Sequence, residues 1–192
     1  MFAIKKERQT ISNLSDAFIC NDSNLIKWIK EIGYATLQKI IDDCQNLTLI
    51  ACDSESKNEW SFLRDKLNLK VLSKEYFLHK LVKYLLCLKI EEILIDENYR
   101  ILLRFLREHY ENVEQRHREQ LENILIPVAN KKLANAKCVC LTQVLNVPLL
   151  ELVYQFGCNK DTNFIDSEFF FSGDTNNIEA LKWQAFFLSI GC

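Results

Sequence analysis

The cysteines are the first residues of this chain whose type supports chemistry, because thiolates bind zinc and act as nucleophiles. The sequence holds eight of them, and Cys138 and Cys140 form the one close pair. A cysteine zinc site needs a second pair and more often has two residues between the members of a pair. Most of the other cysteines lie inside apolar runs. We therefore expect reduced, buried thiols, with no metal and no other cofactor.

Histidines and adjacent carboxylates are the other candidates for catalysis. His79, His109 and His117 fall on predicted helices without a suitable nucleophile, and the last two lie too far apart along one helix to chelate a metal together. Asp42 and Asp43 are neighbours, and neighbouring side chains on a strand point to opposite faces, so they do not form an acid–base pair. Gly-rich phosphate loops, Gly-x-Ser-x-Gly and His-Glu-x-x-His are absent from the sequence. We expect a protein that is not an enzyme.

The composition predicts a globular protein rich in helices. The 192 residues are 48% hydrophobic, with four glycines and two prolines, which excludes collagen-like and largely disordered chains. A net charge of −2 provides no basic field for nucleic acid or an anionic membrane, so direct nucleic-acid binding is not expected. The apolar run Leu85–Ile95 contains charges and is too short to span a membrane. The amino terminus lacks an apolar signal core, which predicts an intracellular location.

The first half of the chain alternates predicted strands and helices. Apolar runs predict strands at 17–20, 47–52 and 69–72, and 35–41 is a candidate edge strand. Ser23 and Ser73 are the expected helix caps, and Gly33 is expected to end the first helix. A further helix begins at about Ser56. The order β-α-β-β-α-β-α predicts an α/β fold with a small parallel four-stranded sheet flanked by helices, with 47–52 in its middle.

The second half is predicted to be mostly α-helical. The expected elements are a helix over 98–118, a helix over 121–136 divided at Pro127, a helix over 141–156, a strand at 168–171, a turn at 172–174 and a helix over 178–190. Arg100, Arg104 and Arg107 share one helical side, with Glu108 and Glu111 nearby. This pattern favours a solvated, charge-paired face over a nucleic-acid footprint.

The order of elements over residues 15–86 resembles a BRCT domain, a small α/β module. A strand ends at Phe18-Ile19-Cys20, and the next helix runs to Gly33. The segment Leu47–Ala51 is similar to the family's Thr-His-Leu strand, and a helix opens with Ser56-Lys57. The segment Lys70–Phe77 is similar to the family's strand-Ser-x-x-Trp-Leu ending. In this chain Tyr76-Phe77 replaces the tryptophan and Leu49 replaces the histidine.

A partial second copy is suggested near the carboxyl end. The strand, turn and helix predicted over 167–192 repeat the scheme of Phe18–Gly33, with Ser172-Gly173 after the strand. The alternative is a terminal strand and helix that pack on the rest of the chain. The predicted organisation is a loose lead-in at 1–14, the BRCT-like domain at 15–86, a helical region at 87–166 and the strand–helix segment at 167–192.

The resemblance implies candidate phosphate ligands. Phosphopeptide-binding BRCT domains hold phosphate with a Ser or Thr after the first strand and a Lys at the start of the second helix. Here Lys57 matches the lysine, and the hydroxyl position falls on Cys20 or on Ser23. Ser172 and Gly173 form a similar local motif in the second segment. The ordinary interpretations are a solvated lysine for Lys57 and a plain helix cap for Ser23.

We expect a non-enzymatic scaffold that binds protein partners, including partners phosphorylated on serine or threonine. The BRCT resemblance implies a nuclear role in the DNA-damage response, DNA repair, replication or checkpoint signalling. Two alternatives stay open. The first is an α-helical subunit of a constitutive complex that does not recognise phosphate, and the second is an accessory domain of an enzyme.

Overall fold

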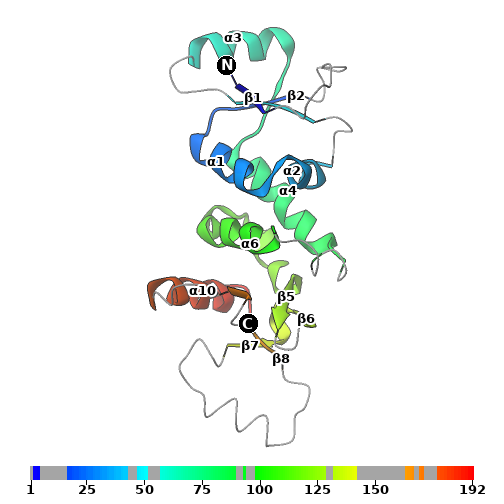
Figure 1. Ribbon diagram of the computed structural model, residues 1–192, viewed down its shortest axis with the longest axis vertical. Helices are drawn as coiled ribbons and strands as arrows, with labels where there is room; N and C mark the ends of the chain where they lie inside the picture. The colour runs from blue at the N-terminus through cyan, green and yellow to red at the C-terminus, as the bar shows by residue number, and fades with distance from the viewer. Residues whose placement is uncertain are drawn as a thin grey trace, which may run out of the picture. The chain divides into compact units, whose positions relative to one another are not determined.

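The computed structural model describes residues 2–4, 17–42, 47–51, 57–89, 93, 98–128, 132–141, 163–166, 169–170 and 177–192. The chain divides into two compact units, Met1–Leu81 and Val82–Cys192 (Figure 1). Both contain helices and strands, which confirms the expected mixed α/β class. Among the described helices, none combines the length and the apolar character that crossing a bilayer requires.

The first unit contains a four-stranded sheet. β1 (Phe2–Ile4), β3 (Thr48–Ala51), β2 (Ala17–Cys20) and β4 (Lys70–Val71) lie in that order. β2 pairs in parallel with β3 and with β4, whereas β1 pairs antiparallel with β3. The predicted strand at 47–52 is therefore confirmed, inside the sheet. The prediction of four parallel strands is not confirmed, because the fourth described strand is β1, which comes from the expected lead-in and runs antiparallel.

The connections between the parallel strands are helical. They contain α1 (Ser23–Ile32), α2 (Tyr34–Ile40) and α3 (Lys57–Leu67), and α4 (Lys74–Cys87) follows β4. α1 and α2 connect β2 to β3, and α3 connects β3 to β4. Since β3 and β4 lie on opposite sides of β2, right-handed crossovers place these connections on opposite faces of the sheet. Figure 1 shows α3 on one side of the sheet and α1 and α2 on the other.

Strand β2 lies at the centre of this core. All four of its side chains are buried, as expected for a strand covered on both faces. α1 buries Leu25, Ile29 and Ile32, and β3 buries Leu49. The Leu72 amide donates to the Ile19 carbonyl at 2.8 Å and so extends the pairing beyond β4.

Helix α2 replaces the predicted edge strand at 35–41, which was a wrong prediction. Leu37, Ile40 and Ile41 are buried, and their spacing of i, i+3 and i+4 is that of a helix. Gly33 has φ +80°, as expected for the residue that ends α1. Its carbonyl accepts from the Leu37 amide at 3.1 Å, so a second helix begins at once.

Of the two predicted helix caps, the structure confirms one and contradicts the other. Ser73 caps α4 as predicted, because its Oγ accepts from the Tyr76 amide at 3.1 Å. The predicted cap of α1 was wrong. The cap is Asp22, whose Oδ1 accepts from the amides of Asn24 at 2.9 Å and Leu25 at 3.1 Å. Ser23 is the first residue of the helix and is exposed.

The second unit is less helical than predicted. Its described elements are α6 (Tyr99–Glu108), η3 (Tyr110–Asn112), α7 (Gln115–Arg118), η4 (Leu121–Asn123), β5 (Leu125–Val128), β6 (Lys132–Asn135), η6 (Ala136–Cys138), β7 (Val139–Cys140), β8 (Asn163–Phe164) and α10 (Asn177–Ser189). The predicted helix over 98–118 ends at Glu108, and the one over 121–136 is wrong, because β5 and β6 form an antiparallel pair. Beyond Leu141, the predicted helix over 141–156 lies outside the described residues.

At the carboxyl end, the strand predicted at 168–171 is wrong for the two residues described there, and the predicted helix is confirmed. Phe169 and Phe170 are helical rather than extended, and Asp166 Oδ1 accepts from the Phe169 amide at 3.1 Å. The helix predicted over 178–190 is confirmed as α10, and Gly191 after it has φ +95°.

The two neighbours at the start of α1 provide a test of the cap. We expect Asp22→Ala to lower the free energy of unfolding by about 1 kcal/mol, because two helix amides lose their acceptor. Ser23→Ala is the matched control and is expected to change it by less than about 0.5 kcal/mol. Urea unfolding followed by circular dichroism measures both. A larger loss for Ser23→Ala would show that the cap is assigned to the wrong residue.

Candidate functional site

The residues predicted to hold phosphate lie at the carboxyl end of β2 and at the start of α3. Cys20 is fully buried, and its Sγ lies 3.8 Å from the Asp22 carbonyl oxygen. Ser23 is exposed on the first turn of α1. Lys57 begins α3, as predicted, but its side chain is not among those described. Ser172 and Gly173 lie outside the described residues, so their role stays a prediction.

Asp22 bears directly on phosphate binding at α1. Free amides at a helix start form an anion site because they donate hydrogen bonds at the positive end of the helix dipole. Here two of these amides donate to the Asp22 carboxylate. A phosphate at this helix end would compete with a negative charge that already accepts those hydrogen bonds.

The cysteines and histidines of the described ranges do not form a reactive cluster. No three His, Cys, Asp or Glu side chains in those ranges gather closely enough to hold a metal ion. Cys138 and Cys140 carry free thiols. Burial, with a smaller contribution from Cys140, raises the pKa of the Cys192 thiol to about 12. This thiol is therefore protonated at neutral pH and is a poor nucleophile.

A groove in the second unit is the more developed candidate site. It lies between the α6–η3 segment and α10 and has a volume of about 390 Å³. Its lining residues are Arg107, Glu108, Tyr110 and Glu111 on one wall and Lys182, Ala185, Phe186 and Ser189 on the other. The groove thus combines charged groups of both signs with two aromatic rings.

Arg107 is the most unusual residue of the groove. Its side chain is only 4% exposed, and its Nη2 lies 2.6 Å from Glu179 Oε1. The guanidinium carbon lies 4.3 Å from the centre of the Trp183 ring, which is a cation–π contact. Nη1 is buried and has no hydrogen-bond partner among the described residues. A buried donor without an acceptor costs free energy, so a ligand that offered an acceptor to this atom would bind more tightly.

Aromatic packing holds Trp183 against the guanidinium. Trp183 contacts Phe170 at a centroid distance of 5.0 Å and stacks on Phe187 at 5.5 Å. All three rings are buried. The position of Arg107 is therefore fixed by a rigid aromatic cluster as well as by its ion pair.

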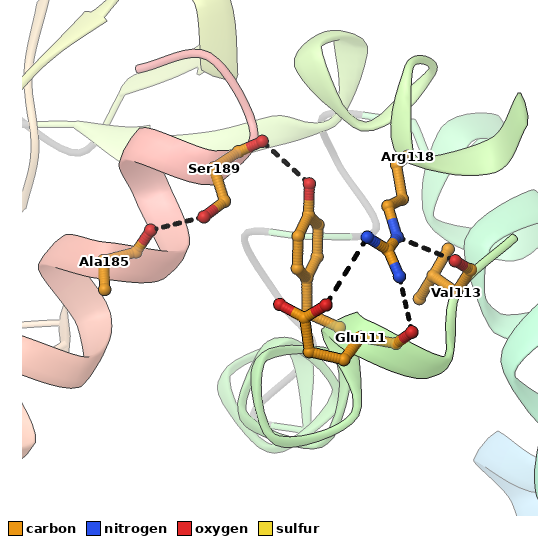
Figure 2. A network of polar contacts seen from close by, with 6 residues as sticks. Glu111, Val113, Arg118, Ala185 and Ser189 are labelled. Atoms are coloured by element: carbon orange, nitrogen blue, oxygen red, sulfur yellow. Dashed lines mark hydrogen bonds and ion pairs between the residues drawn. The ribbon is translucent and has the colours of Figure 1, made fainter. Parts of the chain in front are cut away.

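A second network fixes η3 near the carboxyl end of α10. The Tyr110 hydroxyl donates to the Ser189 carbonyl at 2.8 Å, and the Arg118 guanidinium lies 5.1 Å from the Tyr110 ring centre. Figure 2 shows Arg118 directed at Glu111 and at the Val113 carbonyl. The Tyr110–Ser189 hydrogen bond therefore joins the two walls of the groove, and the Arg118 contacts hold η3 in place.

The outer face of α10 is apolar and exposed. Ile178, Leu181 and Leu188 are 62%, 60% and 57% exposed, and Ala185 between them is also exposed. Their spacing of i, i+3, i+7 and i+10 places them along one side of the helix. We call these four residues the α10 outer stripe. The opposite side of the helix carries Trp183, Phe186, Phe187 and Ile190, which are buried.

The sequence interpretation of the arginines was wrong for Arg107. This residue is buried, whereas the pattern Arg100, Arg104 and Arg107 predicted a solvated face. Arg107 lies four residues after the buried Leu103, so it borders the apolar side of α6, and that spacing was the available signal. Its partner Glu179 is on α10, too distant in sequence for local patterns to identify.

Comparisons of the chain with protein-family models, with curated proteins and with solved structures found no match.

The Arg107–Glu179 pair leads to a stability prediction. We expect Glu179→Gln to lower the free energy of unfolding by about 1–3 kcal/mol, because a buried guanidinium loses its charged acceptor. Glu108→Gln is the matched control. Its carboxylate lies 3.8 Å from the same Nη2, beyond hydrogen-bond distance, so we expect a change below about 0.5 kcal/mol. Equal losses for the two variants in urea unfolding would contradict the assigned role of Glu179.

Phosphate binding near Lys57 has a separate test. If Lys57 binds phosphate, serine-phosphorylated peptides bind at least about tenfold more tightly than plain ones, and Lys57→Ala removes the difference. Asp22→Asn keeps a good helix cap but removes a negative charge, so it is expected to strengthen phosphopeptide binding if the phosphate lies at α1. Fluorescence anisotropy with a peptide library measures this. Equal binding of both peptide forms to the unmodified chain would exclude the site.

Proposed function

We propose that this protein is a non-enzymatic scaffold that binds a protein partner through the α10 outer stripe. The exposure of three large apolar side chains along one side of α10 carries the proposal. Fully burying a Leu or Ile side chain contributes about 1.5–3 kcal/mol. A partner that covers the stripe therefore gains binding free energy from each of these buried side chains.

The arrangement of the stripe distinguishes it from ordinary exposed apolar residues. Single exposed apolar side chains are normal on protein surfaces, whereas contiguous ones mark interaction sites. In the first unit, Phe62 and Leu67 are also exposed on α3. They are five positions apart along the helix, so they point to different sides of it. The α10 outer stripe, by contrast, is continuous over about three helical turns.

The surroundings of the stripe suit a protein partner. Lys182 and Glu179 lie beside it on the same helix and form an ion pair at 3.8 Å. An apolar centre with charged groups at its edge is the usual composition of a protein–protein interface. The stripe also adjoins the α6–α10 groove, because Ala185 belongs to both.

The cellular role in this proposal comes from the resemblance of residues 15–86 to BRCT domains. From that resemblance we propose that the scaffold acts in nuclear DNA-damage, DNA-repair or checkpoint signalling. That proposal includes partners phosphorylated on serine or threonine, with Lys57 as the candidate phosphate ligand. The proposed α10 interface does not require phosphate.

The interface is tested by changing the stripe and nothing beneath it. We expect Leu181→Ser with Leu188→Ser to reduce recovery of a cross-linked partner from cells by about tenfold or more, because both side chains lie at the proposed contact. Phe62→Ser is the matched control, since Phe62 is 60% exposed and lies in the other unit. Equal recovery by the unmodified chain and both variants would refute the proposal.

The same variants test the constitutive-subunit alternative. A subunit whose stripe is always covered is expected to self-associate when isolated, and the double variant is then expected to be monomeric. Light scattering on the purified chains measures this. A monomeric unmodified chain counts against constitutive assembly through this face.

A further inference from the structure

The groove beside the α10 outer stripe is lined by Arg107, whose buried Nη1 is a hydrogen-bond donor without an acceptor among the described residues. Glu179 is the acidic partner of two cations, at 2.6 Å from Arg107 and 3.8 Å from Lys182. The shorter contact is within hydrogen-bond distance, and the longer one is not. Arg107 Nη1 has no partner in the described part of the chain. Glu179 therefore pairs with both cations, and the donor that still lacks an acceptor is Nη1 of Arg107.

We propose that this groove binds the carboxylate of an Asp or Glu side chain, carried by an amphipathic helix of the partner whose apolar side covers the α10 outer stripe. The inference rests on the proposed function, since it specifies the partner of the same surface. Two helices that pack side by side cover one another's apolar stripes. Because Ala185 belongs to both the stripe and the groove, one helix reaches both.

The burial of Arg107 favours an acidic partner side chain over a basic one. A basic partner side chain would meet Glu108 and Glu111, whose side chains are 45% and 88% exposed, and exposed ion pairs contribute little. An acidic side chain meets Arg107, which is almost completely buried and has a donor to satisfy. Hydrogen bonds to buried charged groups contribute considerably more.

A single carboxylate suits the groove better than a phosphate. Glu108 and Glu111 on the wall opposite α10 repel a doubly negative group more strongly than a singly negative one. Lys182 is 60% exposed and makes the first contact with the partner's carboxylate. Nη1 is buried, so neighbouring side chains must shift for a carboxylate to reach it, as rotamers at interfaces commonly do.

The experiment uses a display library of amphipathic helical peptides of about 16 residues, long enough for a helix to span the stripe, selected against the full chain. We expect clones that lose binding to the Leu181→Ser, Leu188→Ser variant to carry Asp or Glu at one fixed position. Replacing that residue by Asn or Gln is expected to weaken binding about tenfold. Lys182→Glu is expected to weaken it similarly, and Lys66→Glu, on exposed α3, is the matched control.

The outcomes separate this inference from the proposed function. Clones that depend on Leu181 and Leu188 but show no acidic preference, or a basic one, would overturn the carboxylate inference and leave the interface standing. Clones whose binding ignores both leucines would overturn the interface itself. Arg107→Lys, with its fold checked by circular dichroism, keeps the charge but removes the Nη1 donor, and unchanged affinity for acidic clones would also overturn the inference.

Discussion

The burial of one positive charge, that of Arg107, constrains how α6 and α10 pack against each other in the second unit. A guanidinium is stable in a low-dielectric environment only with an anionic partner and close packing. Glu179 supplies the charge, and Trp183 supplies a flat surface. Both lie on α10, so the ion pair and the buried apolar side chains of α10 together fix which side of the helix faces inward. The outward exposure of Ile178, Leu181 and Leu188 is a consequence of that orientation.

Much of the first unit was predictable from sequence because its signals are local. The apolar runs that form β2, β3 and β4, and the serine that caps α4, are each read within a few residues. β1 was missed because its pairing partner β3 is remote in sequence. The α2 segment was misread because its apolar residues fit both the strand and the helix period.

The second unit shows where local patterns stop being sufficient. Residues 121–136 have helical spacing, but Pro127 cannot donate inside a helix and is accommodated in β5, opposite Leu133 of β6. The candidate groove could not be predicted from the sequence either, because its two walls come from α6–η3 and α10, which are remote in sequence. Sequence reasoning found the charges of Arg107 and Glu108 but had no means of placing Glu179 and Trp183 against them.

In the proposed interface, the α10 outer stripe and Nη1 of Arg107, which has no partner among the described residues, contribute in different ways to binding. The stripe supplies apolar area, which gives affinity for many partners but discriminates little among them. The buried donor discriminates, because a partner without an acceptor leaves it unsatisfied at a cost of about 1–3 kcal/mol. A partner that supplies the acceptor binds only the folded groove and so stabilises the contact between α6 and α10. In the proposed interface, partner selection and the stability of the second unit are therefore linked through a single guanidinium.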